Sequence, residues 1–238
     1  MSKLYIDPGH GGSDPGAVGN GLKEKDVTLN IAKKVLGELA NYDVQTSMTR
    51  TDDTYVSLSG RAQFANNYKA DFFLSIHINS SANASATGFE SYIHTNAGTD
   101  TAEKQRLLHY EIADVCRKYS MPDRGTKRAN FAVLRETQMP AVLAEIGFIN
   151  NPKEAELLRS EAFLGDVARG IVAGLVRAFS LVRKVPIAPT VIIGEKEYPA
   201  QMVNGQLVVT LPVREAFTAA GCSVEWVEDT KKCYIRRD

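Results

Sequence analysis

The chain has 238 residues, of which 44% are hydrophobic and 24% are charged, and its 28 basic and 28 acidic residues give a formal net charge of +0 at pH 7. This length suits one good-sized domain followed by a small one, and the balanced charge excludes a protein whose overall charge attracts nucleic acid. Three cysteines in this length exclude a disulfide framework, so we expect free thiols.

The N-terminal residues lack the apolar stretch of a signal peptide, and no apolar run approaches the length of a membrane-spanning helix. We therefore expect synthesis in the cytoplasm and no insertion into a membrane. Any polymer that the protein binds must be recognised by a local site, because neither the overall charge nor a block of like charge attracts one.

The first informative stretch is an apolar run at residues 4–6 that breaks into a glycine-rich turn carrying His10. The run predicts a buried strand, and ligand sites in α/β sheets lie beyond the carboxyl ends of the strands. Histidine is a common metal ligand and a good proton carrier, so His10 is the first candidate site residue. A phosphate-binding turn is the alternative, although the stretch has neither a Gly-Lys-Ser/Thr ending nor G-x-G-x-x-G spacing.

Glu24 precedes a run whose apolar spacing predicts an amphipathic helix over residues 27–39. The simplest interpretation of Glu24 is a carboxylate near the positive end of that helix dipole. A strand is predicted at residues 43–48. A second helix follows, with an apolar face formed by Leu58, Ala62, Phe64 and Ala65.

The layout around His10 recurs at residues 70–81, where an apolar strand ends on His77 and small polar residues follow. Two histidines at the ends of neighbouring parallel strands can converge on one crevice. Asn79 is a candidate substrate contact. Glu90, on a predicted strand over residues 88–94, is a second candidate substrate contact, which could shape the cleft or support a ligand histidine. His109 lies in a polar helix predicted over residues 100–119, where we expect a solvated side chain.

Residues 123–130 are basic and loop-like, and a buried strand predicted at residues 141–144 then runs directly into Glu145. A carboxylate among apolar neighbours is costly without a partner or a task, and its pKa should rise. Structural pairing with Arg135 is one interpretation of Glu145. Arg135 is otherwise a candidate contact for a substrate carboxylate. Two closing helices are predicted at residues 153–159 and 162–182.

The alternation of apolar strands and helices predicts an α/β domain over residues 1–182 with helices on both faces of the sheet. Residues 183–189 form a linker with two prolines, and residues 190–238 form a small α+β module. Its predicted elements are strands at residues 191–193, 207–210, 223–227 and 233–236, and a helix at residues 213–220. A hairpin formed by the last two strands would place Cys233 nearer Trp226 than Cys222.

Two histidines and one carboxylate, with a fourth position open, are the ligand set of a catalytic zinc. His10, Glu24 and His77 could provide that set, and zinc would activate water and polarise a carbonyl. A metal does not carry a proton to a leaving nitrogen, and Glu145 in an apolar setting suits that task. The predicted reaction class is metal-assisted hydrolysis of an amide. A zinc peptidase acting on soluble peptides has the same chemistry.

Residues 1–182 resemble the zinc-dependent N-acetylmuramoyl-L-alanine amidases in a series of motifs that occur in the same order and at the same spacing. These motifs are YIDPGHGGSDPGA, LKEKDVTLNIA, TRTDD, SIHINSS, GFESY and PAVLAEIGFINNPKEAELL. The resemblance implies a three-layer α/β/α fold with a mainly parallel sheet, and one zinc held by His10, Glu24 and His77. It makes Glu145 the catalytic residue, and the substrate the peptidoglycan amide between N-acetylmuramic acid and L-alanine. A non-catalytic wall-binding relative would have lost one of these four residues.

Residues 186–238 resemble the small domain at the N-terminus of copper amine oxidases, although they carry no cluster of metal ligands. We expect this module to bind the cell wall or to associate with a second copy, which would raise the local enzyme concentration; a stabilising appendage is the alternative. The absence of a signal peptide suits a phage endolysin released through a holin pore, which the two-part layout favours. It equally suits a bacterial autolysin freed when a mother cell lyses.

Arg50 and Arg61 are two further basic residues of the predicted catalytic domain. Each could brace the sheet through internal hydrogen bonds or contact an acidic group of the substrate. We expect bracing to be their main role.

Overall fold

The computed structural model describes residues 1–184, 190–193, 196–203, 206–209, 221–227 and 232–237. The chain divides into two units, Met1–Lys184 and Val185–Asp238. The division falls inside the predicted linker. None of the described helices is long and apolar enough to cross a membrane.

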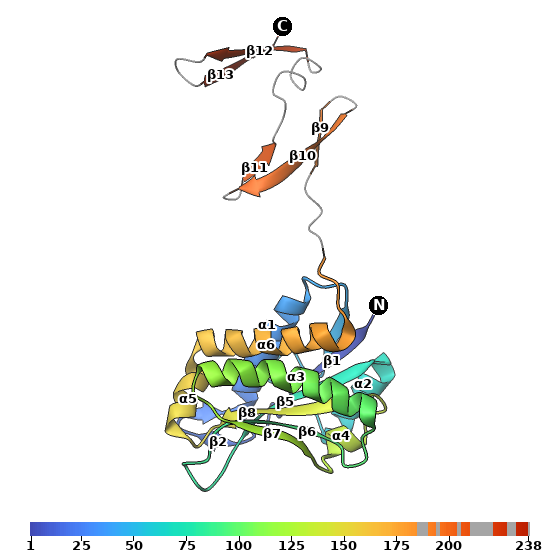
Figure 1. The fold of residues 1–238 in the computed structure, drawn as a ribbon, viewed down its shortest axis with the longest axis vertical. Coiled ribbons are helices and arrows are strands. Elements are labelled where there is room, and N and C mark those ends of the chain that lie inside the picture. The colour runs from blue at the N-terminus through green and yellow to red at the C-terminus, as the bar shows by residue number, and fades with distance from the viewer. Residues whose placement is uncertain (185–189, 194–195, 204–205, 210–220, 228–231, 238) are drawn as a thin grey trace. The chain divides into compact units, whose positions relative to one another are not determined.

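A six-stranded sheet forms the centre of the first unit (Figure 1), with the strand order β4-β1-β5-β8-β6-β7. Four of its five strand pairings are parallel, and only β6 and β8 pair in opposite directions. A short hairpin of β2 (Val18–Gly19) and β3 (Leu22–Lys23) precedes the first helix. The strands of the sheet are β1 (Lys3–Pro8), β4 (Gln45–Met48), β5 (Phe72–Asn79), β6 (Phe89–Ile93), β7 (Asp123–Arg128) and β8 (Ala141–Phe148).

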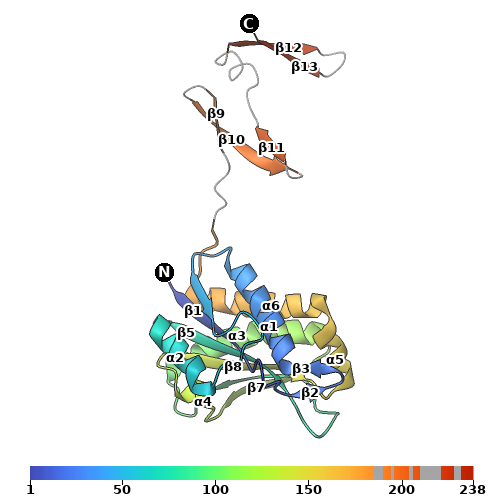
Figure 2. The same ribbon diagram turned by 180° about the vertical axis from the view of Figure 1, so that it is seen from behind.

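Helices cover both faces of the sheet, as Figures 1 and 2 show. On one face lie α1 (Glu24–Leu39), α3 (Thr99–Lys118) and α6 (Glu161–Phe179), with α5 (Pro152–Arg159) packed against α6. On the other face lie α2 (Leu58–Tyr68) and the single turn α4 (Ala132–Arg135). The predicted α/β fold with a mainly parallel sheet between helical layers is therefore confirmed.

Helix α1 follows its predicted amphipathic pattern and buries Val27, Ile31, Val35 and Leu39 against the sheet. Helix α2 does not follow the pattern predicted for it. It buries Ala62 and Ala65, whereas Leu58 and Phe64 are 58% and 46% exposed. Arg61 is buried beside these two alanines, and its guanidinium contacts Asp7 on β1 and the turn that follows it.

Two predictions for residues of α3 and β7 are also wrong. Residues 123–130 contain strand β7 rather than a loop only, and four of the six residues of this edge strand are charged and none is apolar apart from Gly125. His109 is buried rather than solvated. Its ring nitrogens lie 2.9 Å from Ser91 Oγ and 2.8 Å from Asp123 Oδ1, so polar partners on β6 and β7 satisfy it.

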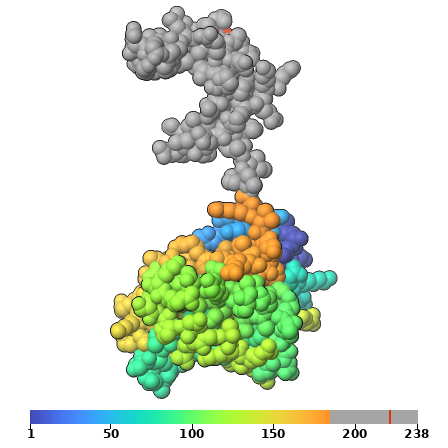
Figure 3. All heavy atoms as spheres, viewed as in Figure 1, coloured from blue at the N-terminus to red at the C-terminus, as the bar shows by residue number. Residues whose placement is uncertain are grey.

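The interface between α3 and α6 is closely packed, and Figure 3 shows their side chains closing this face of the first unit. Two glycines one turn apart on α6 allow the close approach. A Cβ added at Gly174 would lie 2.6 Å from the Cα of Leu108, and one at Gly170 would lie 2.9 Å from Val115 Cγ2. The backbone of α3 therefore fills the space that larger side chains on α6 would need.

The second unit contains five described strands in two sheets. In one, β10 (Lys196–Val203) pairs with β9 (Thr190–Ile193) and β11 (Gln206–Val209); in the other, β12 (Cys222–Val227) pairs with β13 (Lys232–Arg237). The four predicted strands are confirmed, but β10 was not predicted. Cys233 is the register partner of Trp226, as expected, whereas Cys222 pairs with Arg237. The helix predicted at residues 213–220 lies outside the described residues.

Candidate metal and hydrolytic site

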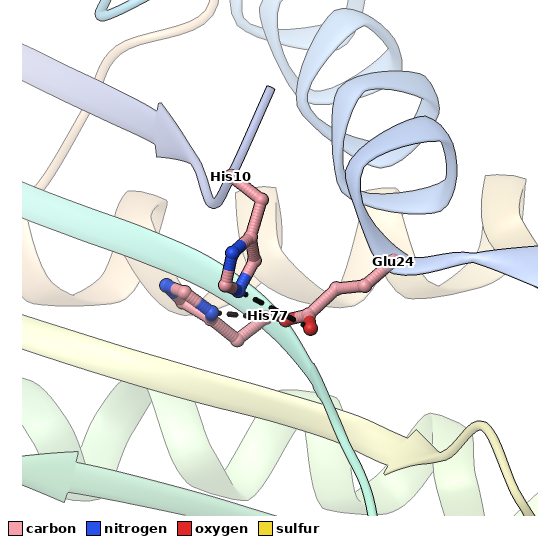
Figure 4. A group of neighbouring side chains, drawn as sticks. All are labelled: His10, Glu24 and His77. Carbon is pink, nitrogen blue, oxygen red and sulfur yellow. Dashed lines mark hydrogen bonds and ion pairs between the residues drawn. The ribbon is translucent and has the colours of Figure 1, made fainter. Parts of the chain in front are cut away.

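The structure brings His10, Glu24 and His77 together at the carboxyl ends of β1 and β5 (Figure 4). His10 follows β1, Glu24 is the first residue of α1, and His77 lies near the end of β5. Each side chain offers one ligand atom, and these atoms lie within 4.8 Å of one another. Glu24 Oε2 is 3.2 Å from His10 Nε2, and Glu24 Oε1 is 3.0 Å from His77 Nδ1.

Backbone amides hold the Glu24 carboxylate between the two rings. The amide of Ala17 donates to Oε2 at 2.8 Å, and the amide of Ile78 donates to Oε1 at 2.9 Å. Glu24 is only 4% exposed. Its position at the first residue of α1 agrees with a helix-dipole role, but both of its oxygens point toward the histidines, so the two roles coexist.

The turn that carries His10 is held in a strained backbone conformation, since His10 has a φ of 61°. Arg61 donates from Nη1 to the Pro8 carbonyl at 2.8 Å and from Nη2 to the His10 carbonyl at 2.6 Å. Arg50 donates from Nη2 to the Gly9 carbonyl at 2.9 Å. Two buried guanidinium groups therefore fix three successive carbonyls of the turn, and the predicted bracing role of these arginines is confirmed.

A buried ion pair fixes the same turn to the sheet. Arg61 Nη1 lies 2.8 Å from Asp7 Oδ1, and both side chains are almost fully buried. The hydroxyls of Thr49 and Ser75 donate to the two oxygens of Asp7 at 2.6 Å and 2.7 Å. Asp7 is thereby satisfied from β5 and from the residue after β4, which makes its burial tolerable.

Two glycines make space for the candidate ligands because they have no side chain. A Cβ at Gly9 would lie 2.4 Å from His77 Cε1, and a Cβ at Gly16 would lie 2.6 Å from Glu24 Oε2. Gly16 also has a φ of 66°, which favours glycine. Any side chain at either position would displace a candidate ligand.

Asp14 fixes the orientation of the His10 ring. Its Oδ2 lies 2.8 Å from His10 Nδ1. Because an ionised carboxylate only accepts hydrogen bonds, Nδ1 is the donor of this contact, and Nε2 faces Glu24. A carboxylate on the second nitrogen of a ligand histidine is the usual support in metal sites. This support for His10 was not assigned from the sequence, although Asp14 lies within the first motif.

The charges of the three residues favour a cation between them. Burial alone would lower the pKa of His10, but its hydrogen bonds to Glu24 and Asp14 outweigh burial and raise it to about 9. Burial would likewise lower the pKa of His77, yet Glu24 and Glu145 raise it. Burial would raise the pKa of Glu24, and the two histidines lower it. Without a metal ion, protonated imidazoles provide the positive charge that balances Glu24. A metal ion would have to displace these protons in order to bind.

Glu145 lies beside this group on β8, where it is the direct register partner of His77 on β5. Burial raises the pKa of Glu145 to about 7, as its apolar flanks predict. Its Oε2 is the one buried side-chain oxygen or nitrogen without a hydrogen-bond partner among the described residues. Arg135 does not pair with it, since the Arg135 guanidinium contacts Asn130 and Glu136 instead.

Glu90 is the register partner of Glu145 on the other side, across the antiparallel pair of β6 and β8. Asn79 Nδ2 donates to Glu90 Oε1 at 2.7 Å. Of the two predicted substrate contacts, Glu90 thus lies next to Glu145, and Asn79 is hydrogen-bonded to Glu90. Arg135 lies on α4 with a half-exposed side chain.

A cleft of about 310 Å³ opens beside His10, His77 and Glu145. Its remaining wall is mostly apolar, and it includes the exposed rings of Tyr55 and Phe131. The Phe131 ring contacts Tyr92 edge-on, with 5.2 Å between the ring centroids. An apolar wall beside three titratable groups suits a substrate that combines a bulky body with one polar bond to be broken.

The first unit matches a known protein family. The family model described as N-acetylmuramoyl-L-alanine amidase matches residues 4–177. The chain is similar to a sporulation-specific N-acetylmuramoyl-L-alanine amidase of Bacillus subtilis (strain 168), with 50% identity over 183 residues, 76% of this chain and 69% of the relative. It is also similar to an endolysin of Bacillus phage SPP1, with 46% identity over 188 residues, 77% of this chain and 69% of the relative.

Solved structures agree with this match. The catalytic domain of CwlV, an N-acetylmuramoyl-L-alanine amidase from Bacillus (Paenibacillus) polymyxa var. colistinus, is 37% identical and superimposes with a TM-score of 0.71 over 76% of this chain and 99% of that chain. An N-acetylmuramoyl-L-alanine amidase from Clostridium difficile 630 is 39% identical, with a TM-score of 0.71 over 75% of this chain and 97% of that chain.

Proposed function

Because the chain belongs to the N-acetylmuramoyl-L-alanine amidase family, we propose that it is a peptidoglycan hydrolase that cleaves the amide between N-acetylmuramic acid and L-alanine of the stem peptide. The observation that carries this proposal is the group of His10, Glu24 and His77 beside the buried, unpartnered oxygen of Glu145. A cation is favoured among His10, Glu24 and His77, and Glu145, the proposed proton carrier, lies on the neighbouring strand.

We propose that His10, Glu24 and His77 hold one zinc ion. Two imidazole nitrogens and one carboxylate oxygen within 4.8 Å suit zinc in ligand type and number, and they leave a coordination position for water or substrate. When bound there, zinc supplies activation of water and polarisation of the scissile carbonyl. Asp14 keeps Nε2 of His10 directed inward, and Arg50 and Arg61 keep the turn in place.

Glu145 acts in this proposal as the proton carrier. With its pKa at about 7, the carboxylate can accept a proton from the attacking water and then donate it to the nitrogen of the departing L-alanine. Its unpartnered Oε2 is available for both transfers because no other described group bonds to it. The apolar cleft wall around Tyr55 and Phe131 receives the bulky muramoyl side of the substrate.

The test is the release of new L-alanine amino termini by the full chain. Purified peptidoglycan should release them, a chelator should stop the release, and added zinc should restore it. Free stem peptide should remain intact. Cleavage of free stem peptide at a similar rate would instead support a zinc peptidase, and binding to peptidoglycan without any release would support a non-catalytic wall-binding protein.

The biological setting has two candidates. A catalytic unit followed by a small second unit favours a phage endolysin, and a mother-cell autolysin is the alternative with the same chemistry. The relatives of this chain include both a phage endolysin and a sporulation-specific amidase at similar identity.

The second unit is proposed to bind the cell wall or to mediate self-association. Its described strands form two small antiparallel sheets, the scale at which a module needs further packing or a partner. The full chain and a chain ending at Lys184 can be compared by sedimentation with purified walls and by light scattering. Equal sedimentation and equal mass per particle would leave only a stabilising role for this unit.

A further inference from the structure

A row of charged side chains crosses the sheet from the candidate metal ligands to the edge strand. Strands β5, β8, β6 and β7 are hydrogen-bonded neighbours in this order. His77 pairs with Glu145, and Glu145 pairs with Glu90. Directly paired residues on neighbouring strands point to the same face of a sheet. The face that carries the site therefore continues over β6 to the basic residues of β7.

Glu90 at the centre of this row is fully occupied. Its Oε1 accepts from Asn79 Nδ2 at 2.7 Å and from the Tyr92 hydroxyl at 2.8 Å. Its Oε2 accepts from Arg124 Nε at 2.7 Å and from the Lys127 ammonium. A carboxylate offers about four acceptor positions, and four donors fill them here. Glu90 therefore anchors its neighbours and has no acceptor left for a substrate.

The two cations that bind Glu90 still have N–H groups that make no hydrogen bond within the described residues. We call Arg124 and Lys127 the β7 cationic pair. Their side chains are 37% and 35% exposed, whereas that of Glu90 is 3% exposed. Lys127 uses one of its three N–H groups on Glu90, and Arg124 uses Nε on Glu90 and Nη1 on the Thr87 carbonyl at 3.3 Å. One buried carboxylate against two cations leaves one positive charge facing solvent.

The proposed reaction sets the direction in which the substrate crosses this face. If Glu145 protonates the departing nitrogen, the L-alanine end of the stem peptide lies at Glu145 on β8, and the peptide can continue over the neighbouring strand β6. The heads of the cationic pair touch Glu90 and so lie over β6, about one strand spacing, ~5 Å, from β8. An extended peptide covers about 3.3–3.6 Å per residue, so the second stem residue reaches them.

We propose that the β7 cationic pair binds the free α-carboxylate of the second residue of the stem peptide and thereby favours walls in which that carboxylate is not amidated. This inference rests on the proposed amidase function. Glu90 and Asn79 act as positioning residues for the pair, and neither contacts the substrate. The substrate carboxylate would accept hydrogen bonds from an arginine and a lysine that Glu90 already holds in place.

The test compares two stem tripeptides as inhibitors of wall hydrolysis by the full chain. They are L-Ala-γ-D-Glu-L-Lys and the same peptide with the α-carboxylate of its second residue amidated. The wild-type protein should bind the acid about tenfold more tightly than the amide, as one charge-assisted contact predicts. Lys127→Met and Arg124→Met should each bring this ratio toward one, and Lys127→Arg should restore it.

Arg128→Gln is the matched control, because Arg128 lies on the same strand but donates to the Thr95 and Ala97 carbonyls. It should leave the ratio unchanged. Zinc content and thermal unfolding show whether each variant is folded and holds its metal. The ratio of the two peptide affinities in the wild-type protein tests the proposal even if a variant does not fold. Equal inhibition by the two peptides, or none by either, while walls are still hydrolysed would overturn this inference alone. Failure to hydrolyse walls would instead overturn the proposed function.

Discussion

Glu145 combines three properties in one side chain: burial, a raised pKa and an oxygen without a partner. Glu145→Gln keeps the shape of the side chain and removes its capacity to carry a proton. We expect turnover to fall by about 10²–10⁴. Zinc content should not change, since Glu145 is not one of the three converging residues. L-alanine release and metal analysis measure the two effects.

Glu161→Gln is the matched control for Glu145→Gln, because Glu161 is an exposed residue that pairs with Lys34 and does not line the cleft. It should hydrolyse walls at the wild-type rate. Near-normal turnover of the Glu145 variant would contradict its assignment as the proton carrier, whereas lost zinc in that variant would mean that Glu145 also supports the ligands.

Asp14 contributes to the site through His10 rather than directly. Asp14→Asn should weaken zinc binding by about 10–100-fold, because an amide no longer provides the charge that keeps the ring oriented. Competition with a chromogenic chelator measures the affinity without any turnover. Asp26→Asn removes the same charge two residues from Glu24 at an exposed position and should change the affinity little. Equal losses in the two variants would point to a general charge effect.

The site residues differ in how far the sequence could reveal them. His10 and His77 end apolar strands, and Glu145 interrupts an apolar run, so each breaks a pattern in a visible way. Asp14 was not assigned as the partner of His10, since a carboxylate in a loop has no pattern to break. The pairing of Glu90 with Lys127 depends on which strands are neighbours, and no local pattern encodes that.

Among the elements, the contact between α3 and α6 depends on glycine for its distance. Gly174→Ala should destabilise the protein by about 1–3 kcal/mol, because the new Cβ would lie 2.6 Å from the Leu108 backbone and the helices would have to separate. The better helix propensity of alanine offsets at most about 1 kcal/mol of this cost. The free energy of unfolding in urea measures the difference.

Gly37→Ala on α1 is the matched substitution, since nothing lies within 4 Å of the added Cβ. Only helix propensity acts there, and we expect a stabilisation of about 0.5–1 kcal/mol. The two substitutions are chemically identical and should have opposite signs. A stabilising Gly174→Ala would mean that the interface can widen without loss of packing.

The elements were predictable where a buried face sets the periodicity. Helix α1 and strands β1, β5 and β8 are buried on a regular pattern, and their predicted positions are confirmed. Strand β7 was missed because an edge strand can carry charged side chains throughout. Helix α2 was assigned the wrong apolar face. Arg61 points inward because it pairs with the buried carboxylate of Asp7, and the spacing of apolar residues along the helix does not reveal such a pair.

At the scale of the whole molecule, Glu90 links the catalytic side of the sheet to its edge and makes stability depend on acid. Burial would raise the pKa of Glu90, but hydrogen bonds from Lys127, Arg124 and Tyr92 lower it to about 2, against 4.5 for an ordinary glutamate. A carboxyl group with a lowered pKa in the folded state stabilises the protein above pH 4.5. That contribution is lost as the pH falls from 4.5 toward 2.

We expect Glu90 to contribute about 2 kcal/mol of this acid-sensitive stability. The free energy of unfolding at pH 6 and at pH 3 measures it. Other carboxylates also lose stability in acid, so the relevant quantity is the difference between wild type and Glu90→Gln. The variant should be less stable at pH 6 and should lose less on acidification. Parallel losses in both proteins would contradict the role of Glu90.

The arrangement of the whole sheet could be predicted only in part. Alternating strands and helices predict a parallel sheet with helices on both faces, which is confirmed. The antiparallel insertion of β6 between β8 and β7 was not predictable, because strand order depends on long-range packing. In the second unit, β10 was missed because its polar residues interrupt an alternating pattern.

The central position of β8 also bears on the order in which the site is made. All three candidate metal ligands lie within the first 77 residues, but Glu145 arrives on β8, which inserts between β5 and β6. As chains are synthesised from the N-terminus, the candidate metal ligands emerge well before Glu145. If Glu145 carries the proton, as proposed, the nascent chain holds its candidate metal-binding residues for a long stretch of synthesis before it can hydrolyse its substrate.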